Sequence, residues 1–326
     1  MPAAVDIPLA LVSLFGALHV LGEHRATLLT GRPRSRRDRI RAAYFYLALV
    51  VILIALATQI DSLSDKLFWV HMIQHILLLS VAAPLIALAA PWSSIWRPLP
   101  LGMRRTLAKG VARSRWAAPL RYVCRLLGRP IPALVAYTVT IAVWHVPAAY
   151  DAAVGTRWIH DIEHTTFLLV GVLLWVQVID SPPLRARLSQ IHRVWYIVAA
   201  AIPGWIISLI LIFATHPLYP FYGSLHHRPG GISALADQQL AGGMMLVPGS
   251  LAMSIYVFVQ IYRWLAAEDD RRPPRGGQRL ATPVGPLDGA PPPGGEPVPA
   301  PLAPLDGGAP APNGNGAAQP SRPVEA

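Results

Sequence analysis

Long apolar runs constrain this chain more than any other feature. Seven of them lie near residues 4–22, 42–60, 67–90, 131–150, 160–179, 194–215 and 238–264. Their lengths are close to the roughly 20 residues that an α-helix needs to cross a bilayer. Backbone amides in lipid must be bonded within their own segment, and the runs are too long and continuous for β-barrel strands. The sequence therefore predicts an all-α polytopic membrane protein with seven transmembrane helices.

The charged residues predict how these helices are oriented. Only 14% of the chain is charged, against about 25% in a typical soluble protein. The formal net charge of +11 could suggest a nucleic-acid partner, but the arginines cluster in alternate loops, at 32–41, 91–130 and 180–193, and after residue 262. Such clusters mark the cytoplasmic side of a membrane protein. We therefore expect a lipid bilayer and no nucleic acid as partner, with the N-terminus outside and the C-terminus cytoplasmic.

The two ends of the chain differ in composition. Residues 1–6 carry no Lys or Arg, so the first apolar run is expected to remain as a span rather than to act as a secretory signal. Residues 1–265 are predicted to form the seven-helix transmembrane domain. Residues 266–326 are rich in Pro, Gly and Ala and are predicted to form a disordered cytoplasmic tail. Cys124 is the single cysteine, which excludes a disulfide within the chain.

Histidines gather at the predicted outer ends of the helices. His71 and His75, in HMIQH, enter the third span, and residues four apart share one face of a helix. His160 and His164, in HDIEH, repeat this spacing at the start of the fifth span, and His145 ends the fourth. Imidazole is costly to hold inside a membrane unless it is paired. The pattern predicts one shallow polar site that is built from both pairs and His145.

The residue types at this site favour a metal ion. Imidazole nitrogens suit Cu, Zn, Fe or Ni, and the thioethers of Met72, Met244 and Met245 favour copper, especially Cu(I). Asp161 and Glu163 could accept the second N–H of metal-bound imidazoles. Haem is the alternative cofactor. The simpler alternatives are ordinary packing for the methionines and an interfacial position for any one histidine.

The last span begins with DQQLAGGMMLVPG, and its Asp237 is predicted to lie at the outer mouth of the bundle. It is a candidate for the metal site, although an aspartate before an apolar helix also serves as an N-cap. Pro84 is expected to kink or loosen the third span. His19, Glu23 and His24 lie near the cytoplasmic end of the first span and receive no predicted role.

The motifs HMIQH, WHVPAAYD, HDIEH and DQQLAGGMMLVPG, in this order, resemble the CtaG family of bacterial membrane proteins, which are assembly factors for cytochrome c oxidase. The similarity in layout covers about residues 5–265. The resemblance implies a protein of the bacterial cytoplasmic membrane that helps a haem–copper oxidase to mature at the stage of copper insertion, with oxidase subunits as partners. The matching candidate site residues are His71, His75, His145, His160, His164 and Asp237.

These observations lead to a hypothesis of an outward-facing histidine cluster that binds and delivers copper. The protein would then be a metallochaperone and not an enzyme. A haem-binding membrane cytochrome and a copper transporter are the alternatives. Histidine pairs within one helix suit a small ion better than a flat macrocycle, and apolar central stretches such as ILLLSVAAPLIALA argue against a continuous polar path.

Overall fold

The computed structural model describes residues 7–225 and 227–271. Within these residues the chain forms helices and no strand, which confirms the predicted all-α class. The helices are α1 (Ile7–Thr30), α2 (Arg36–Leu56), α3 (Gln59–Ser64), α4 (Phe68–Ile76), the π-helix η1 (Leu77–Ala82), α5 (Ala83–Ala89), α6 (Trp92–Trp96), α7 (Leu101–Arg113), α8 (Ala118–Leu127), α9 (Pro130–Trp144), α10 (Pro147–Gly155), α11 (Arg157–Trp175), α12 (Gln190–Phe213), α13 (Pro220–Gly223), the 3₁₀ turn η2 (Pro229–Gly231), α14 (Ala234–Leu246) and α15 (Pro248–Arg271).

In the described residues each predicted span overlaps a helix or a run of helices, but only some of these helices are both long and apolar enough to cross a membrane. Among the described residues, four segments are long and apolar enough to cross a membrane: Arg36–Ser64, Phe68–Ala89, Gln190–Phe213 and Ala234–Glu268. The pair α8 and α9, bent by 93°, would make a fifth. The count of seven spans and the orientation of the termini therefore stay predictions.

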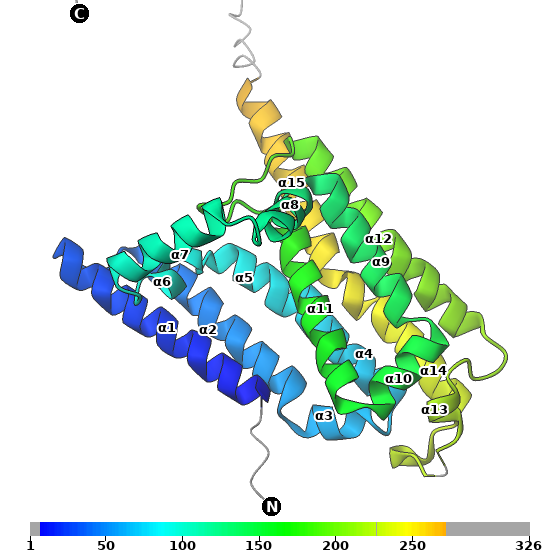
Figure 1. Ribbon diagram of the computed structural model, residues 1–326. Coiled ribbons are helices and arrows are strands. Elements are labelled where there is room, and N and C mark those ends of the chain that lie inside the picture. The colour runs from blue at the N-terminus through cyan, green and yellow to red at the C-terminus, as the bar shows by residue number, and fades with distance from the viewer. Residues whose placement is uncertain (1–6, 226, 272–326) are drawn as a thin grey trace, which may run out of the picture. The chain divides into compact units, whose positions relative to one another are not determined.

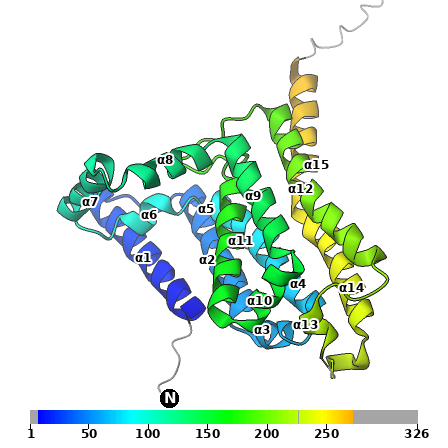
Figure 2. The ribbon, with the colours of Figure 1, turned by 45° about the vertical axis from the view of Figure 1, so that its right-hand side comes forward.

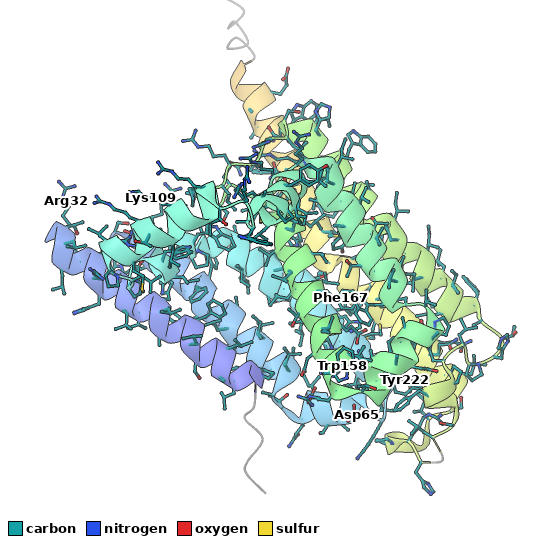
Figure 3. All side chains as sticks on the ribbon, in the orientation of Figure 1. Arg32, Asp65, Lys109, Trp158, Phe167 and Tyr222 are labelled. Carbon is teal, nitrogen blue, oxygen red and sulfur yellow. The ribbon has the colours of Figure 1, made fainter. Side chains whose placement is uncertain are left out.

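The helices place two kinds of loop at opposite ends of the bundle. In Figures 1 and 2, α3, α10 and α13 lie at one end, and α6 and α7 lie at the other. Figure 3 shows Arg32 and Lys109 at the end of the bundle where α7 lies, far from Asp65 and Tyr222. The arginine-rich loops, which alternate along the sequence with loops poor in arginine, thus gather at one end of the bundle. The helices that carry the histidine pairs start at the opposite end.

Helix α11 packs in the middle of the bundle, against α9, α10, η1 and α5. Phe167 and Trp175 on α11 are buried in the largest apolar cluster. Gly171 lies between them, and a Cβ atom placed there would lie 3.0 Å from Ala83 Cβ and 3.2 Å from Leu79 Cδ2. The glycine therefore lets α11 approach the helix that continues from His75, as small residues do in membrane bundles.

The predicted loosening at Pro84 takes the form of the π-helix η1. The amide of Ala83 donates to the carbonyl oxygen of Leu78, five residues back. The next amide in this pattern would reach Leu79, but it belongs to Pro84, which has no N–H. Trp175 Nε1 on α11 donates to Leu79 O instead, at 3.0 Å. This π-helical segment directly follows the helix that carries the first histidine pair, and such segments are common near functional sites.

The C-terminal region extends further as a helix than predicted. Helices α14 and α15 together cover the predicted last span, at 238–264. Helix α15 continues to Arg271, beyond the predicted domain boundary at 265. The rest of the predicted tail lies outside the described residues.

Candidate metal centre

Helix α4 presents His71 and His75 on one buried face. Their Nε2 atoms lie 2.9 Å apart, and both side chains are almost fully buried. In a neutral pair, only one of these two nitrogens can donate a proton, and the other must accept. The i, i+4 spacing therefore places the two imidazoles side by side on one face of the helix, as the sequence predicted.

Asp237 on α14 positions this helix. Its two carboxylate oxygens accept the backbone N–H groups of Phe68 and Trp69, each at 3.0 Å. These are the first amides of α4, which has no cap from its own N-terminal residue. Helix α14 is capped by Ser233 instead. The structure therefore places Asp237 on the start of α4, rather than among the imidazoles or as the cap of its own helix.

Helix α11 supplies the opposite face of the centre. Glu163 is fully buried, with Oε2 3.5 Å from His71 Nε2 and Oε1 3.5 Å from His75 Nε2. His164 lies beside it, with its ring centroid 5.4 Å from that of His75. The sequence predicted that Glu163 would orient imidazoles through their second N–H. The structure gives it the position of a ligand, since both its oxygens face the nitrogens of the first pair.

Four side chains thus form a compact cluster, which we call the His–Glu cluster: His71, His75, Glu163 and His164. One ligand atom from each lies within 4.8 Å of all the others. Both oxygens of Glu163, and Nε2 of His164, are buried without a hydrogen-bond partner. Leaving such an atom unpaired costs about 1–3 kcal/mol. The donor set fits a metal ion, because imidazole nitrogens and a carboxylate oxygen are common ligands of first-row metals.

The hydroxyl group of Tyr222 lies beside Nδ1 of His71 and favours one tautomer of this ring. Tyr222 Oη donates to Ser64 O at 2.5 Å and lies 3.5 Å from His71 Nδ1. Its single proton is therefore used, and its oxygen is left to accept from Nδ1–H. His71 Nε2 then carries the lone pair that faces Glu163. This partner of His71 was not predicted, because nothing in the local sequence links residue 222 to residue 71.

The other two predicted histidines border the His–Glu cluster. His160 lies with its ring centroid 4.1 Å from that of His164 and 5.1 Å from that of His71. His145, the C-cap of α9, donates from Nδ1 to Ile141 O at 2.8 Å, and its ring centroid is 6.1 Å from that of His75. Nε2 of both residues is buried and unpartnered. The structure therefore brings all five predicted histidines together.

Aromatic side chains cover this group on two sides. Phe167, one turn after Glu163 on α11, packs on His75 with a centroid distance of 4.3 Å. Tyr150 packs on His71 at 5.0 Å, and its hydroxyl lies 3.4 Å from that of Tyr222. Each of these two rings covers one side of an imidazole of the first pair, and such apolar cover strengthens electrostatic interactions at the cluster.

Residues without a predicted role have local partners. His19 Nδ1 lies 3.1 Å from Tyr46 Oη, and Glu23 pairs with Arg34 at 3.1 Å. His216, in the loop after α12, is exposed and is not a member of the His–Glu cluster.

Comparison with known proteins identifies the family of this chain. "Uncharacterized protein Mb0105" of Mycobacterium bovis and "Uncharacterized protein MT0111" of Mycobacterium tuberculosis are each 26% identical to it over 230 residues, which are 64% of this chain and 31% of theirs. "Uncharacterized protein ML1998" of Mycobacterium leprae is 23% identical over 231 residues, which are 68% of this chain and 33% of its own. The chain thus spans about a third of the length of these relatives. No solved structure matches it. The family model of the cytochrome c oxidase caa3 assembly factors, Caa3_CtaG, matches residues 26–267, and the chain therefore belongs to this family.

Proposed function

We propose that this assembly factor binds copper in the His–Glu cluster and delivers it to a haem–copper cytochrome c oxidase. The observation that carries the proposal is the convergence of four ligand atoms from two helices within 4.8 Å, three of them on residues with buried, unpartnered atoms. A cation at this point would satisfy the carboxylate and the imidazole lone pairs together. The cluster would face the outer side of the bacterial cytoplasmic membrane, at the end away from the arginine-rich loops.

The ligand set suits a carrier rather than a permanent store. It offers imidazole and carboxylate, and the lone cysteine, Cys124, lies on α8, which contributes nothing to the cluster. Thiolates hold copper more tightly than neutral imidazoles, so their absence from the cluster favours release to the oxidase. The protein acts in this scheme as a metallochaperone that presents its cargo to oxidase subunits, and not as an enzyme.

Haem fits this arrangement less well than an ion. Axial ligands of haem approach the iron from opposite faces of a flat macrocycle. His71 and His75 share one helix with their Nε2 atoms 2.9 Å apart, and the ring of His164 packs 5.4 to 5.6 Å from both. These contacts leave no slot for a macrocycle between the rings.

Copper binding by the purified full chain tests the proposal. We expect the metal-free protein in detergent to take up copper against a competing chelator, and the Glu163→Gln variant to bind at least about 10-fold more weakly. Copper at about 100 times its dissociation constant should stabilise the wild-type protein by about 2.7 kcal/mol, seen as a higher melting temperature, and the variant much less. The same exchange should lower oxidase activity in cells.

Asp161→Asn is the matched control, because Asp161 is a neighbouring acid on α11 that pairs with Arg157 and lies outside the cluster. It should bind copper like the wild type. A wild-type protein that takes up no copper, or one that shows a strong Soret band after purification, would rule out the proposal.

A further inference from the structure

A small cavity adjoins the His–Glu cluster. It has a volume of about 70 Å³ and lies between α4, η1, α9, α12, α14 and α15. This exceeds the roughly 10–15 Å³ that one water molecule needs. His75 is the one member of the cluster that lines the cavity, together with His145 and three methionines: Met72, Met245 and Met253.

Each of the two histidines at the cavity has one ring nitrogen without a hydrogen-bond partner among the described residues. His75 turns Nε2 toward His71 and Glu163, and its Nδ1, on the other edge of the ring, is buried without a partner. His145 uses Nδ1 to donate to Ile141 O, so in the neutral ring Nε2 carries the lone pair. That Nε2 is also buried without a partner.

The methionines add soft ligands to these nitrogens. Met72 is fully buried on α4, Met253 is buried on α15, and Met245 is partly buried on α14. Three separate helices therefore direct a thioether-bearing residue to one cavity beside two unpaired imidazole nitrogens. Thioethers select Cu(I), whereas carboxylates suit harder cations. The cavity, with its thioethers, therefore favours Cu(I), whereas the carboxylate of the His–Glu cluster favours a harder cation.

We propose that the cavity is a second metal position, which holds Cu(I) between His75 Nδ1, His145 Nε2 and a thioether of Met72, Met245 or Met253. His75 belongs to both positions through its two nitrogens. A neutral imidazole has one lone pair and one N–H, so filling both positions together requires His75 to release its ring proton to solvent and to bridge the two ions as an imidazolate. This inference rests on the proposed copper-binding function and adds to it a site of a different ligand class.

Copper stoichiometry and sulfur coordination test this position. The full chain in detergent is loaded with Cu(I) under anaerobic, reducing conditions and then examined by metal analysis and X-ray absorption at the copper edge. We expect sulfur scattering in the wild type. The triple variant Met72→Leu, Met245→Leu, Met253→Leu should lose this scattering and one copper equivalent, while Met-to-Leu exchange keeps volume and apolar character nearly constant.

Two further variants separate the second position from the first. Met244 is the neighbour of Met245 but does not line the cavity. Met244→Leu should therefore change neither the copper stoichiometry nor the X-ray absorption spectrum. Glu163→Gln should weaken binding at the His–Glu cluster and leave the sulfur scattering in place. Copper bound by nitrogen and oxygen alone, with no response to the triple exchange, overturns the second position and leaves the proposed function standing. A wild type that binds no copper overturns both.

Discussion

Two buried acids, Asp237 and Glu163, have different tasks at the scale of single residues. Both oxygens of Asp237 receive backbone N–H groups, so its charge is balanced by the start of α4. Glu163 lies 3.5 Å from two imidazole nitrogens, which is longer than the usual 2.7–3.2 Å of a hydrogen bond. Glu163 is therefore the buried acid whose oxygens lack a hydrogen-bond partner, whereas Asp237 bonds the start of α4.

Replacing Asp237 with alanine should lower stability without removing the metal ligands. The amides of Phe68 and Trp69 would lose their acceptors, and the loss of such a cap costs about 0.5–2 kcal/mol. We expect a lower melting temperature in detergent but an unchanged copper stoichiometry per folded chain. Loss of copper from a variant that stays as stable as the wild type would instead make Asp237 a ligand, as its place in the sequence motif first indicated.

At the scale of elements, the packing of α11 against the continuous segment α4–η1–α5 positions the histidine pair of α11 relative to the pair of α4. The π-helix widens the turn after His75, and Gly171 lets α11 lie against it at short range. Pro84 removes the amide that would bond Leu79, and Trp175 replaces it from α11. A side chain of one histidine-bearing segment therefore completes the backbone bonding of the other, which holds the two in register.

Trp175→Phe should disturb this register. The exchange keeps an aromatic ring in the core but takes the Trp175 donor from the carbonyl oxygen of Leu79, a partly buried residue, at a cost of about 1–3 kcal/mol. We expect a lower melting temperature and weaker copper binding together. Trp144→Phe is the control, because Trp144 Nε1 donates at 2.9 Å to the hydroxyl of Thr166, which already donates to Glu163 O and keeps that bond. Equal losses in the two variants would contradict a special role for the Trp175 bond.

At the scale of the whole transmembrane region, charge separates the two ends of the bundle. Arg32 and Lys109 mark one end, and Asp65 and Tyr222 mark the other, near the starts of α4 and α11 (Figure 3). Under the positive-inside rule, the first end is cytoplasmic. The His–Glu cluster, near the starts of α4 and α11, then lies nearer the outer side, which is the side that the proposed delivery of copper requires.

Labelling of the single cysteine tests this orientation. Cys124 is exposed on α8, at the arginine-rich end. A membrane-impermeant thiol reagent should label it in inverted vesicles and not in intact cells. A second variant, in which Cys124→Ser is combined with Ser62→Cys on the exposed surface of α3, should give the opposite pattern. Labelling of Cys124 from outside intact cells would show that the orientation is reversed.

Much of the candidate site could be predicted from local spacing. Two HxxxH pairs place their imidazoles on single faces, and both pairs begin helices at the same end of the bundle. The predicted convergence of these four histidines followed from the two facts, and that of His145 followed from its place at the end of the fourth predicted span. The position of Glu163 opposite the first pair did not, because helix periodicity alone does not tell which acid near a histidine points at another helix.

The sequence by itself determined the helical class, the apolar length of the main segments and the shared face of each histidine pair, because these depend on neighbours within one or two turns. Only the tertiary structure decided which acid lies among the histidines and which caps a helix. The contact between Asp237 and the amide of Trp69 spans 168 residues. Such contacts depend on the rotation and axial offset of each helix, and packing between helices sets both, as at Gly171 and Trp175.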